Sequence, residues 1–455
     1  MIMYPDYVVK NIRSFKDLIN VMLTEHGSTI AFSRSDGDVE YGELVDRVLR
    51  FANGISKVKC ERIRIDVDNA VSFASAYLAI VAVGKTAVLG ESSFPLDDGV
   101  FNVDDEVYLK YSDNAPLSVS ALPDLDIDRV CTILHSSGTA SAPKGLMLSQ
   151  KNICSDVVAG LQKYSMRKGD RFIGLIPYYH AFGIVCDLLG PFLVGATIYV
   201  LDNKKAFFSE MPHIKPTMLN VPPIIAETML KLIKSVKSAD AVTGGCIRKI
   251  LCGGAGLKAS VSEELREYGI NAYGCYGLSE CSPCVAVNRD DYYKDGSAGV
   301  PLNCNVVTIA EDGEILVSGT NVMKGYCNDS ESADGVLVDG VLHSGDLGYI
   351  DKDGFLFVTG RKSNLIVFDD GTKCSPESLE EQIVLNTSAE EALVYRSDKE
   401  LRATLCAKIY LPDISKKESV IDFVTKELTN RKFDSIEFTE SPLPKNATGK
   451  IKRGL

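Results

Sequence analysis

The sequence lacks the long apolar runs and the blocks of basic residues that would direct it to a membrane or to nucleic acid. No stretch reaches the roughly 18 consecutive apolar residues that a membrane-spanning helix needs, so we expect no transmembrane segment. The net charge is −12 and no polybasic block occurs, which argues against nucleic acid or a membrane surface as a general partner. A bound anion would therefore need a local cluster of positive charge.

The sequence also lacks the cysteine spacing of a metal site and the features of a secretory signal. Its 13 cysteines are scattered. Only Cys275, Cys281 and Cys284 lie close together, and no second group of cysteines with matching spacing completes a metal site. The N-terminus shows no basic segment followed by an apolar core. We therefore expect reduced thiols and a cytoplasmic protein.

With 455 residues the chain is too long for one ordinary core, so two or three domains are expected. Apolar periodicity predicts a helix at 41–55. A strand at 62–67, a helix at 70–83 and a strand at 86–90 form a β-α-β pattern, which indicates a parallel sheet. Residues 95–128 are rich in aspartate, and we expect them to be irregular.

Residues 130–149 are the centre of the functional argument. The apolar, β-branched run at 130–134 predicts a buried strand, and small, turn-forming residues follow it up to Pro143, Lys144 and Gly145. Such a loop exposes N–H groups and hydroxyls that a polyphosphate can bind, and Lys144 adds a positive charge. Because Gly145 and not Ser or Thr follows Lys144, this is not the Walker type of phosphate loop. A flexible Ser/Gly surface loop is the alternative.

The run at 136–145 resembles the phosphate loop of the AMP-forming adenylating enzymes, which include acyl-CoA synthetases, luciferases and the adenylation domains of peptide synthetases. The family's loop usually reads Thr-Ser-Gly-Thr-Thr-Gly-x-Pro-Lys-Gly, and this chain departs from it at Ala140 and Ser141. The resemblance implies that the loop binds ATP, and that Thr139 is also catalytic and a magnesium ligand. The implied phosphate-binding residues are Ser136, Ser137, Gly138, Thr139 and Lys144.

The spacing of Pro177, His180 and Gly183 is similar to the family's Pro-x-x-His-x-x-Gly. A lone histidine beside aromatic residues is otherwise often a packed structural residue. Amino-acid-activating members usually carry a Phe-Asp pair here, so His180 implies a carboxylic acid substrate without an amine. In the family this histidine lies beside the substrate and gives way to the incoming thiol, which makes His180 a candidate catalytic residue.

The glycine-rich turn at 253–256 leaves two interpretations open. Gly254, Gly256 and Ala259 satisfy the dinucleotide fingerprint Gly-x-Gly-x-x-Ala between a predicted strand and a predicted helix, so a nicotinamide-dependent oxidoreductase is an alternative. However, the next strand does not end in an acidic residue that could hold a ribose hydroxyl. The adenylating family has a Gly-Gly-Ala here that lies along adenine and substrate, which implies nucleotide contacts for Gly254 and Ala255.

The next predicted strand ends in Tyr276-Gly277-Leu-Ser279-Glu280, which resembles the family's Tyr-Gly-x-Thr-Glu. The resemblance implies that Tyr276 lies against adenine beside Gly277, that Ser279 contacts the α-phosphate, and that Glu280 is a catalytic residue and ligand of Mg²⁺. A carboxylate suits this hard cation. The alternative is a strand-end turn with a solvated glutamate.

Residues 297–360 are β-rich, and Lys324-Gly-Tyr326 looks like part of the family's small barrel-like segment. His343-Ser-Gly-Asp346-Leu-Gly is close to the family's Thr-Gly-Asp-x-Gly, which implies that Asp346 accepts the two ribose hydroxyls. The resemblance also implies that Arg361 reaches the nucleotide. The family's hinge lies two residues later, where this chain has Ser363.

The resemblance implies an α/β fold in two domains. Residues 1–361 would form a large N-terminal adenylating domain of stacked mixed β-sheets with flanking helices and a β-rich segment. Residues 362–455 would form a small, mobile α+β lid domain, in which Ser375 and Pro376 predict a helix start. The C-terminal run resembles the family's Pro-x-x-x-x-Gly-Lys, so Lys450 is the implied catalytic, ATP-binding lysine that enters and leaves the site.

The ordered motifs imply an enzyme that uses ATP and Mg²⁺ to convert a fatty or aryl carboxylic acid to an acyl-adenylate. A thiol acceptor would then form a thioester, with coenzyme A as the expected acceptor and the phosphopantetheine of an acyl carrier protein as the alternative. Two hypotheses of other classes stay open. One is the nicotinamide-dependent oxidoreductase, and the other is a non-catalytic nucleotide-binding relative, suggested by Ala140, Ser141 and Ser363.

Overall fold

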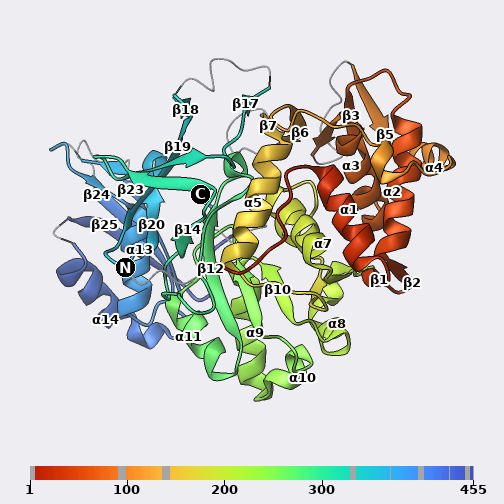
Figure 1. Cartoon of the computed structure of the whole chain (residues 1–455). Helices are drawn as coiled ribbons and strands as arrows, with labels where there is room; N and C mark the ends of the chain where they lie inside the picture. Colours follow the sequence, from red (N-terminus) through yellow and green to blue (C-terminus); the bar gives the residue numbers. More distant parts are fainter. Residues whose placement is uncertain are drawn as a thin grey trace. The chain divides into compact units, whose positions relative to one another are not determined.

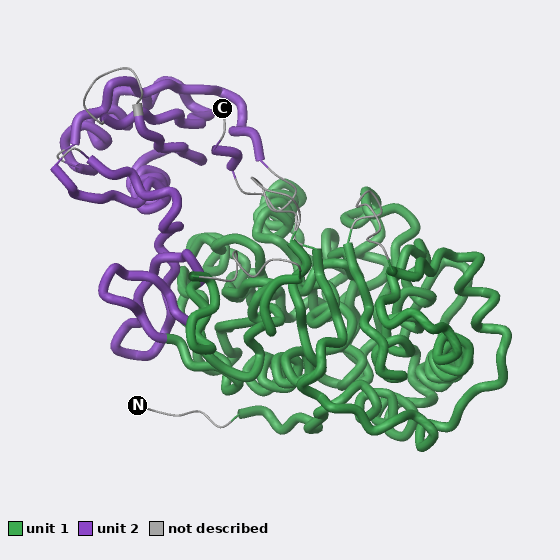
Figure 2. The backbone as a smooth tube through the Cα atoms, turned by 90° about the horizontal axis from the view of Figure 1, so that it is seen from above, with its two compact units in different colours: residues 1–307, 317–343 green, residues 308–316, 344–455 purple. Residues whose placement is uncertain are grey.

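A computed structural model of the chain describes residues 6–90, 99–135, 144–327, 335–368, 370–397, 404–429, 431–445 and 451–453. The chain forms two compact units, which Figure 2 colours separately. The first contains residues 1–307 and 317–343, and the second contains residues 308–316 and 344–455. The predicted domain boundary between residues 361 and 362 falls inside the second unit, and it stays a prediction about which part moves. Among the helices of the described ranges, none is long and apolar enough to cross a membrane.

The first unit contains a six-stranded sheet with the strand order β17-β7-β6-β4-β3-β5. Its strands are β3 (Arg62–Ile65), β4 (Thr86–Leu89), β5 (Val100–Val103), β6 (Val130–His135), β7 (Gly145–Ser149) and β17 (Gly325–Tyr326). Strands β3 and β4 are parallel and are connected by α3 (Ala70–Ala82), so the predicted β-α-β unit is confirmed. Helices α1 (Phe15–His26), α2 (Tyr41–Ile55) and α3 lie side by side and contact one another (Figure 1).

The expectation of an irregular segment at 95–128 is wrong for part of its length. Strand β5 pairs in parallel with β3, and α4 (Asp105–Ser112) follows it. The helix begins because the side chain of Asp104 accepts a hydrogen bond from the N–H of Val107. The run Val100–Val103 does not alternate between apolar and polar residues, and aspartate is typical of helix caps as well as of loops.

A second sheet of the first unit has the order β10-β11-β12-β13-β14 and carries the predicted site residues Tyr276 and Gly277. Its strands are β10 (Met218–Val221), β11 (Lys249–Cys252), β12 (Asn271–Gly277), β13 (Cys284–Val287) and β14 (Val300–Pro301). The first three are parallel, and β13 runs antiparallel to β12. A further sheet has the order β2-β1-β9-β8, with β1 (Ile30–Arg34), β2 (Gly37–Glu40), β8 (Arg171–Ile173) and β9 (Thr197–Tyr199).

Helices flank these sheets, and several begin where the sequence predicts. The remaining helices of the first unit are α5 (Gln150–Lys163), α6 (Ala181–Ile184), a π-helix (Val185–Leu189), α7 (Gly190–Val194), α8 (Phe207–Ile214), α9 (Pro223–Val236), α10 (Ala239–Thr243) and α11 (Ala259–Glu267). The apolar core around β10, β11 and α9 includes Met229, Ile233 and Ile250, all without exposed surface.

The second unit has its own apolar core, which includes Ile383, Val394 and Leu405. Strands β15 (Asn305–Ile309), β16 (Glu314–Gly319) and β19 (Val341–Ile350) cross the division between the units. The unit also contains β20 (Leu356–Arg361), β21 (Ile366–Val367), β22 (Lys373–Cys374), α13 (Pro376–Asn386), β23 (Glu391–Ser397), β24 (Thr404–Tyr410), α14 (Lys417–Asp422) and β25 (Phe433–Thr439). The predicted start of α13 is confirmed, since the Ser375 side chain accepts a hydrogen bond from the Ser378 N–H.

Helix α5 fixes the turns of the first unit through buried polar side chains. Its N-terminus is a capping box between Ser149 and Asn152. The Nδ2 of Asn152 donates to the carbonyl oxygens of Thr320 and Val322, both at 2.8 Å. One turn later, Asp156 accepts a hydrogen bond from Asn321 Nδ2 at 3.1 Å. Burial raises the pKa of Asp156 well above its ordinary value.

Asn321 connects this helix to the turn before β13. Its Nδ2 also donates to the carbonyl oxygens of Cys281 at 3.0 Å and Cys284 at 2.7 Å, and the residue has no exposed surface. The backbone N–H of Cys284 donates to Asp156 at 3.3 Å. The segment at 320–323 and the turn at 281–284 are therefore held against α5 by one connected set of buried hydrogen bonds.

We predict that Asn321→Ala lowers the free energy of unfolding of the first unit by about 2 kcal/mol, because the buried oxygens around it lose their donor. Urea unfolding followed by circular dichroism measures the change. Asn303→Ala is the matched variant, because Asn303 donates to Asp6 and Gln162 at an exposed position. Equal destabilisation by the two variants would contradict the assigned importance of the buried amide.

Candidate functional site

The predicted site residues fall into three groups. Ser136, Ser137, Gly138, Thr139 and Lys450 lie outside the described residues. Eight lie in the first unit, namely Lys144, His180, Gly254, Ala255, Tyr276, Gly277, Ser279 and Glu280. Asp346 and Arg361 belong to the second unit.

The turn after β12 requires its glycine. A Cβ on Gly277 would lie 2.0 Å from the carbonyl oxygen of Pro283, so no other residue fits without moving the turn. The N–H of Leu278 donates to that same oxygen at 2.8 Å. A short 3-10 turn, Ser279–Cys281, follows and carries Glu280. The motif at 276–280 therefore forms a tight turn at the end of β12, and this turn requires the glycine at position 277.

Glu280 and Lys144 are brought together by Tyr326, a residue to which the sequence motifs assign no site role. The hydroxyl of Tyr326 donates to Glu280 Oε1 at 2.8 Å, and Lys144 Nζ lies 5.5 Å from the centre of the Tyr326 ring. Burial raises the pKa of Tyr326, and the negative charge of Glu280 raises it further. The phenol of Tyr326 therefore contacts both the carboxylate of Glu280 and the ammonium group of Lys144.

The assignment of Tyr326 to a barrel-like segment is wrong. Strand β17 pairs with β7 in the six-stranded sheet, with Tyr326 opposite Leu146 and Gly325 opposite Met147. A two-residue strand has no periodicity that a sequence could reveal, and its partner is far away in the chain. The only signal in the sequence is the family-like Lys-Gly-Tyr run itself.

His180 is an exposed residue of a loop that ends at α6. The loop is closed by a hydrogen bond from His180 N to the Pro177 carbonyl oxygen at 3.1 Å. A Cβ on Gly183 would lie 2.3 Å from that oxygen, which explains the glycine of this motif. The ring of Phe182 packs against Gly253, where a Cβ would approach it to 2.9 Å. The histidine loop and the glycine-rich turn after β11 are therefore neighbours.

The glycine-rich turn does not have the geometry of a dinucleotide fingerprint. Gly254 has a φ of +83°, which favours glycine, and α11 begins only at Ala259. The run from Gly254 to Lys258 is therefore a loop, whereas the fingerprint opens a helix. This geometry and the family assignment given below both favour the ligase over the oxidoreductase.

Asp187 in the π-helix forms a hydrogen bond with the backbone just before the histidine loop. Asp187 accepts hydrogen bonds from Ile176 N at 3.3 Å and from Asn220 Nδ2 at 2.9 Å. Burial raises the pKa of Asp187 to about 7, against the opposing effect of these hydrogen bonds and of the positive charge of Lys204. This carboxyl group is one that sequence reasoning missed, because nothing in the local pattern marks it.

In the second unit, Asp346 and Arg361 form an ion pair of 2.7 Å between the Asp346 Oδ1 and the Arg361 Nε. The two residues lie opposite each other on the antiparallel strands β19 and β20. The side chain of Asp346 is only 6% exposed, whereas that of Arg361 is 49% exposed. The carboxylate assigned to the ribose and the guanidinium assigned to the nucleotide are therefore direct neighbours.

The donor set fits a magnesium ion that arrives with a nucleotide. Among the described residues, no cluster of three or more His, Cys, Asp or Glu side chains could hold a metal ion. Mg²⁺ is usually bound by one or two carboxylates together with substrate phosphates and waters. A single carboxylate, Glu280, near Lys144, which the motifs predict to bind phosphate, fits that pattern.

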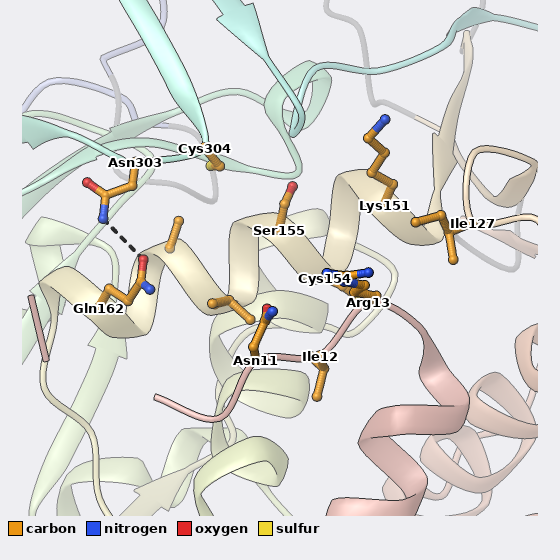
Figure 3. Close-up of a pocket in the computed structure, with 12 residues that line it drawn as sticks. Asn11, Ile12, Arg13, Ile127, Lys151, Cys154, Ser155, Gln162, Asn303 and Cys304 are labelled. Atoms are coloured by element: carbon orange, nitrogen blue, oxygen red, sulfur yellow. Dashed lines mark hydrogen bonds between the residues drawn. The ribbon is translucent and has the colours of Figure 1, made fainter. Parts of the chain in front are cut away.

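A separate cavity of about 230 Å³ lies along α5 in the first unit (Figure 3). Its lining includes Asn11, Arg13, Lys151 and Gln162, and Asn303 donates to Gln162 Oε1 at 3.1 Å. The residues that line it include none of the predicted site residues, so we assign no nucleotide to it.

The two compact units and the tight turns after β11 and β12 agree with the fold that the motifs imply for an adenylate-forming enzyme. The chain belongs to the family described as AMP-binding enzyme, whose profile matches residues 97–327, just over half of the chain. This confirms the recognition made from the motifs and the class of an AMP-forming ligase.

Similar proteins cover most of the chain. A 2-succinylbenzoate–CoA ligase of Bacillus cereus is 26% identical over 449 residues, which is 91% of this chain and 92% of that protein. A medium-chain fatty-acid–CoA ligase of Escherichia coli is 30% identical over 349 residues, or 72% of this chain and 61% of that protein. The crystal structure of an anthranilate CoA ligase with anthranoyl-AMP has a TM-score of 0.83 at 18% identity, covering 99% of this chain and 96% of that one. The predicted fold class is thereby confirmed.

We predict that Asp187→Asn changes how stability depends on pH. Because the pKa of Asp187 is raised from 3.8 to about 7, the folded chain keeps a proton that the unfolded chain releases, so stability falls as pH rises through this interval. An asparagine side chain at this position cannot ionise, so the variant should lose that fall, which is on the order of a few kcal/mol.

Thermal unfolding from pH 4.5 to 8 measures this difference between variant and wild type. Asp202→Asn, at an exposed position, should leave the profile unchanged. Parallel profiles for wild type and Asp187→Asn would show that Asp187 does not titrate in this range.

Proposed function

We propose that this chain activates an aryl or fatty carboxylic acid with ATP and transfers the acyl group to coenzyme A. The observation that carries the proposal is that Tyr326 contacts both Glu280 and Lys144, so that a carboxylate and an ammonium group from two motifs meet at one side chain. The family and its named CoA ligases support ATP, Mg²⁺ and coenzyme A as the cofactors.

In the first step an oxygen of the substrate carboxylate attacks the α-phosphorus of ATP, and the bond to the leaving pyrophosphate breaks. The carboxylate is already the nucleophile and needs no general base, so the protein acts by positioning and by stabilising negative charge. Lys144, Thr139 and Lys450 would bind the phosphates, and Ser279 the α-phosphate. Mg²⁺, held by Glu280 with Thr139, would neutralise phosphate charge.

The other nucleotide contacts follow the family motifs. Tyr276 and Gly277 would lie along adenine with Gly254 and Ala255. Asp346 would accept the ribose hydroxyls, and Arg361, which already binds Asp346, would reach the nucleotide. Ser136, Ser137 and Gly138 would complete the phosphate loop.

In the second step the thiol attacks the acyl carbonyl, a thioester forms and AMP leaves. We assign His180 to the place where acid and thiol meet, because its loop contacts the glycine-rich turn through Phe182 and Gly253. Residues 362–455 would move between the steps, a kind of motion that often limits turnover. A carrier-protein phosphopantetheine is the alternative acceptor.

We propose an aryl acid as the first candidate substrate. The ring of Phe182 against Gly253 offers an apolar, aromatic surface beside His180, and the Bacillus relative is named for an aryl acid. A medium-chain fatty acid is the second candidate, after the Escherichia relative.

All 13 cysteines are free thiols, which supports a cytoplasmic location.

We predict that pyrophosphate is released from ATP and Mg²⁺ in the presence of aryl or medium-chain fatty acids, and not with amino acids. The assay contains no thiol, so it reports the first step alone, and coenzyme A or a phosphopantetheinylated carrier protein is then added. Lys450→Ala should lower the release on the order of 10²–10³-fold, because one preorganised charge is lost.

Release with a single acid class identifies the substrate class. If no acid of the panel causes pyrophosphate release although ATP still binds, acid activation by this chain is contradicted and a non-catalytic relative is favoured. Tight binding of a nicotinamide dinucleotide without ATP binding would support the oxidoreductase instead.

We predict that Asp346→Ala weakens ATP binding by about 10–100-fold, the effect of losing hydrogen bonds to a charged group. Isothermal titration with ATP measures the dissociation constant. Asp312→Asn is the matched variant, because Asp312 also forms an ion pair in this unit, with Lys362 at 2.6 Å. An unaltered dissociation constant in Asp346→Ala would remove its ribose role.

A further inference from the structure

Tyr326 reaches the candidate site from a segment that is held at both ends. The N–H of Met323 donates to the Glu280 carbonyl oxygen at 2.8 Å, and the N–H of Lys324 donates to the Met147 carbonyl oxygen at 2.9 Å. The N–H of Cys327 donates to the Gly145 carbonyl oxygen at 2.6 Å. The segment at 323–327 therefore connects the Glu280 turn with the strand that follows the phosphate loop.

The hydroxyl of Tyr326 fixes one oxygen of Glu280. A glutamate in a short turn has several free torsions, and a hydrogen bond from a half-buried ring restricts them. The bond is an O–H donating to a carboxylate, which is stronger than a bond between neutral groups. A tyrosine hydroxyl can both donate and accept hydrogen bonds, and toward a carboxylate it donates. The second carboxylate oxygen can then bind a cation in a defined direction.

The ring of the same residue faces Lys144. An ammonium group 5.5 Å from a ring centre lies within the range of a cation–π interaction. A phenol that donates a hydrogen bond to a carboxylate has a more electron-rich ring. This strengthens the attraction between the ring and Lys144. Tyr326 thus links the metal-binding side and the phosphate-binding side of the site by a single side chain.

We propose that Tyr326 is a positioning residue that orients Glu280 for the magnesium ion of MgATP and holds Lys144 beside it. The proposal rests on the proposed function, since it takes Glu280 as the metal ligand. Groups that orient a metal ligand commonly contribute about 10–100-fold to metal affinity or activity. Tyr326 acts through Glu280 and Lys144 and does not itself touch the reacting atoms.

The test uses the full chain and compares ATP binding with Mg²⁺ and with EDTA by isothermal titration. Tyr326→Phe keeps the ring and removes the hydroxyl, so it should lower the gain in affinity that Mg²⁺ provides on the order of 10-fold, with binding in EDTA unchanged. Tyr326→Leu also removes the ring, so it should weaken binding in EDTA as well, because Lys144 is no longer held.

Tyr7→Phe is the matched variant, since the Tyr7 hydroxyl also donates to a carboxylate, that of Asp290 at 3.1 Å, outside the candidate site. It should behave as wild type in both titrations. Circular dichroism and the melting temperature check that each variant is folded. If Tyr326→Phe melts early, Tyr326→Phe and Tyr7→Phe are compared at a temperature where both are fully folded.

Glu280→Gln separates failure of this inference from failure of the proposed function. If Glu280→Gln loses the Mg²⁺-dependent gain and Tyr326→Phe adds nothing in that background, the coupling is established. If Glu280→Gln loses the gain and Tyr326→Phe alone keeps it, Tyr326 only fills space and the inference is overturned. If Glu280→Gln keeps the gain, Glu280 is not the metal ligand, and the proposed role of that residue fails first.

Discussion

The first unit depends on one buried hydrogen-bonded set, formed by Asn152, Asp156 and Asn321. Two loop segments that are distant in sequence, at 281–284 and 320–323, meet at α5. A buried amide can serve several carbonyl groups at once, and leaving any of them without a donor would be costly. The turn that carries Glu280 and the segment that carries Tyr326 therefore take their positions from the same helix.

In the second unit, ion pairs hold the segment around residues 361–364, whereas buried amide hydrogen bonds hold the turns against α5 in the first unit. Arg361 binds Asp346 across β19 and β20, and Lys362 binds Asp312 and Glu314. Lys362 opens the short 3-10 turn at Lys362–Asn364, and Asn364 Nδ2 donates to Glu377 Oε1 at 2.6 Å. Most of these side chains are partly exposed, and such pairs are weak individually. A segment held by partly exposed ion pairs can exchange partners more readily than one held by buried amides, which suits a region expected to include a hinge.

Elements could be predicted from the sequence where they follow from nearby residues. The helix start at Ser375 depends on residues within a few positions of one another, and the β3-α3-β4 unit follows from three successive segments. The motif glycines can be found because tight turns demand them, as those at Gly277 and Gly183 do. Tyr326 and Asp187 cannot be found in this way. Their roles arise from partners 46 and 33 positions away, Glu280 and Asn220, and neither lies in a period or a turn that marks it.

The composition of the candidate site explains why such distant partners are needed. One carboxylate binds Mg²⁺ weakly by itself, so an ion at Glu280, the proposed ligand, would be held jointly by this residue and the phosphates of the nucleotide. Joint binding works only if the carboxylate already points at the place where the phosphates come to lie, because each free torsion of Glu280 would have to be fixed on binding. A site with many acidic ligands could tolerate a mobile one, and a site with a single acidic ligand cannot. In our proposal the hydrogen bond from Tyr326 supplies that orientation before the nucleotide arrives, and the ring of the same residue contacts the positive charge of Lys144.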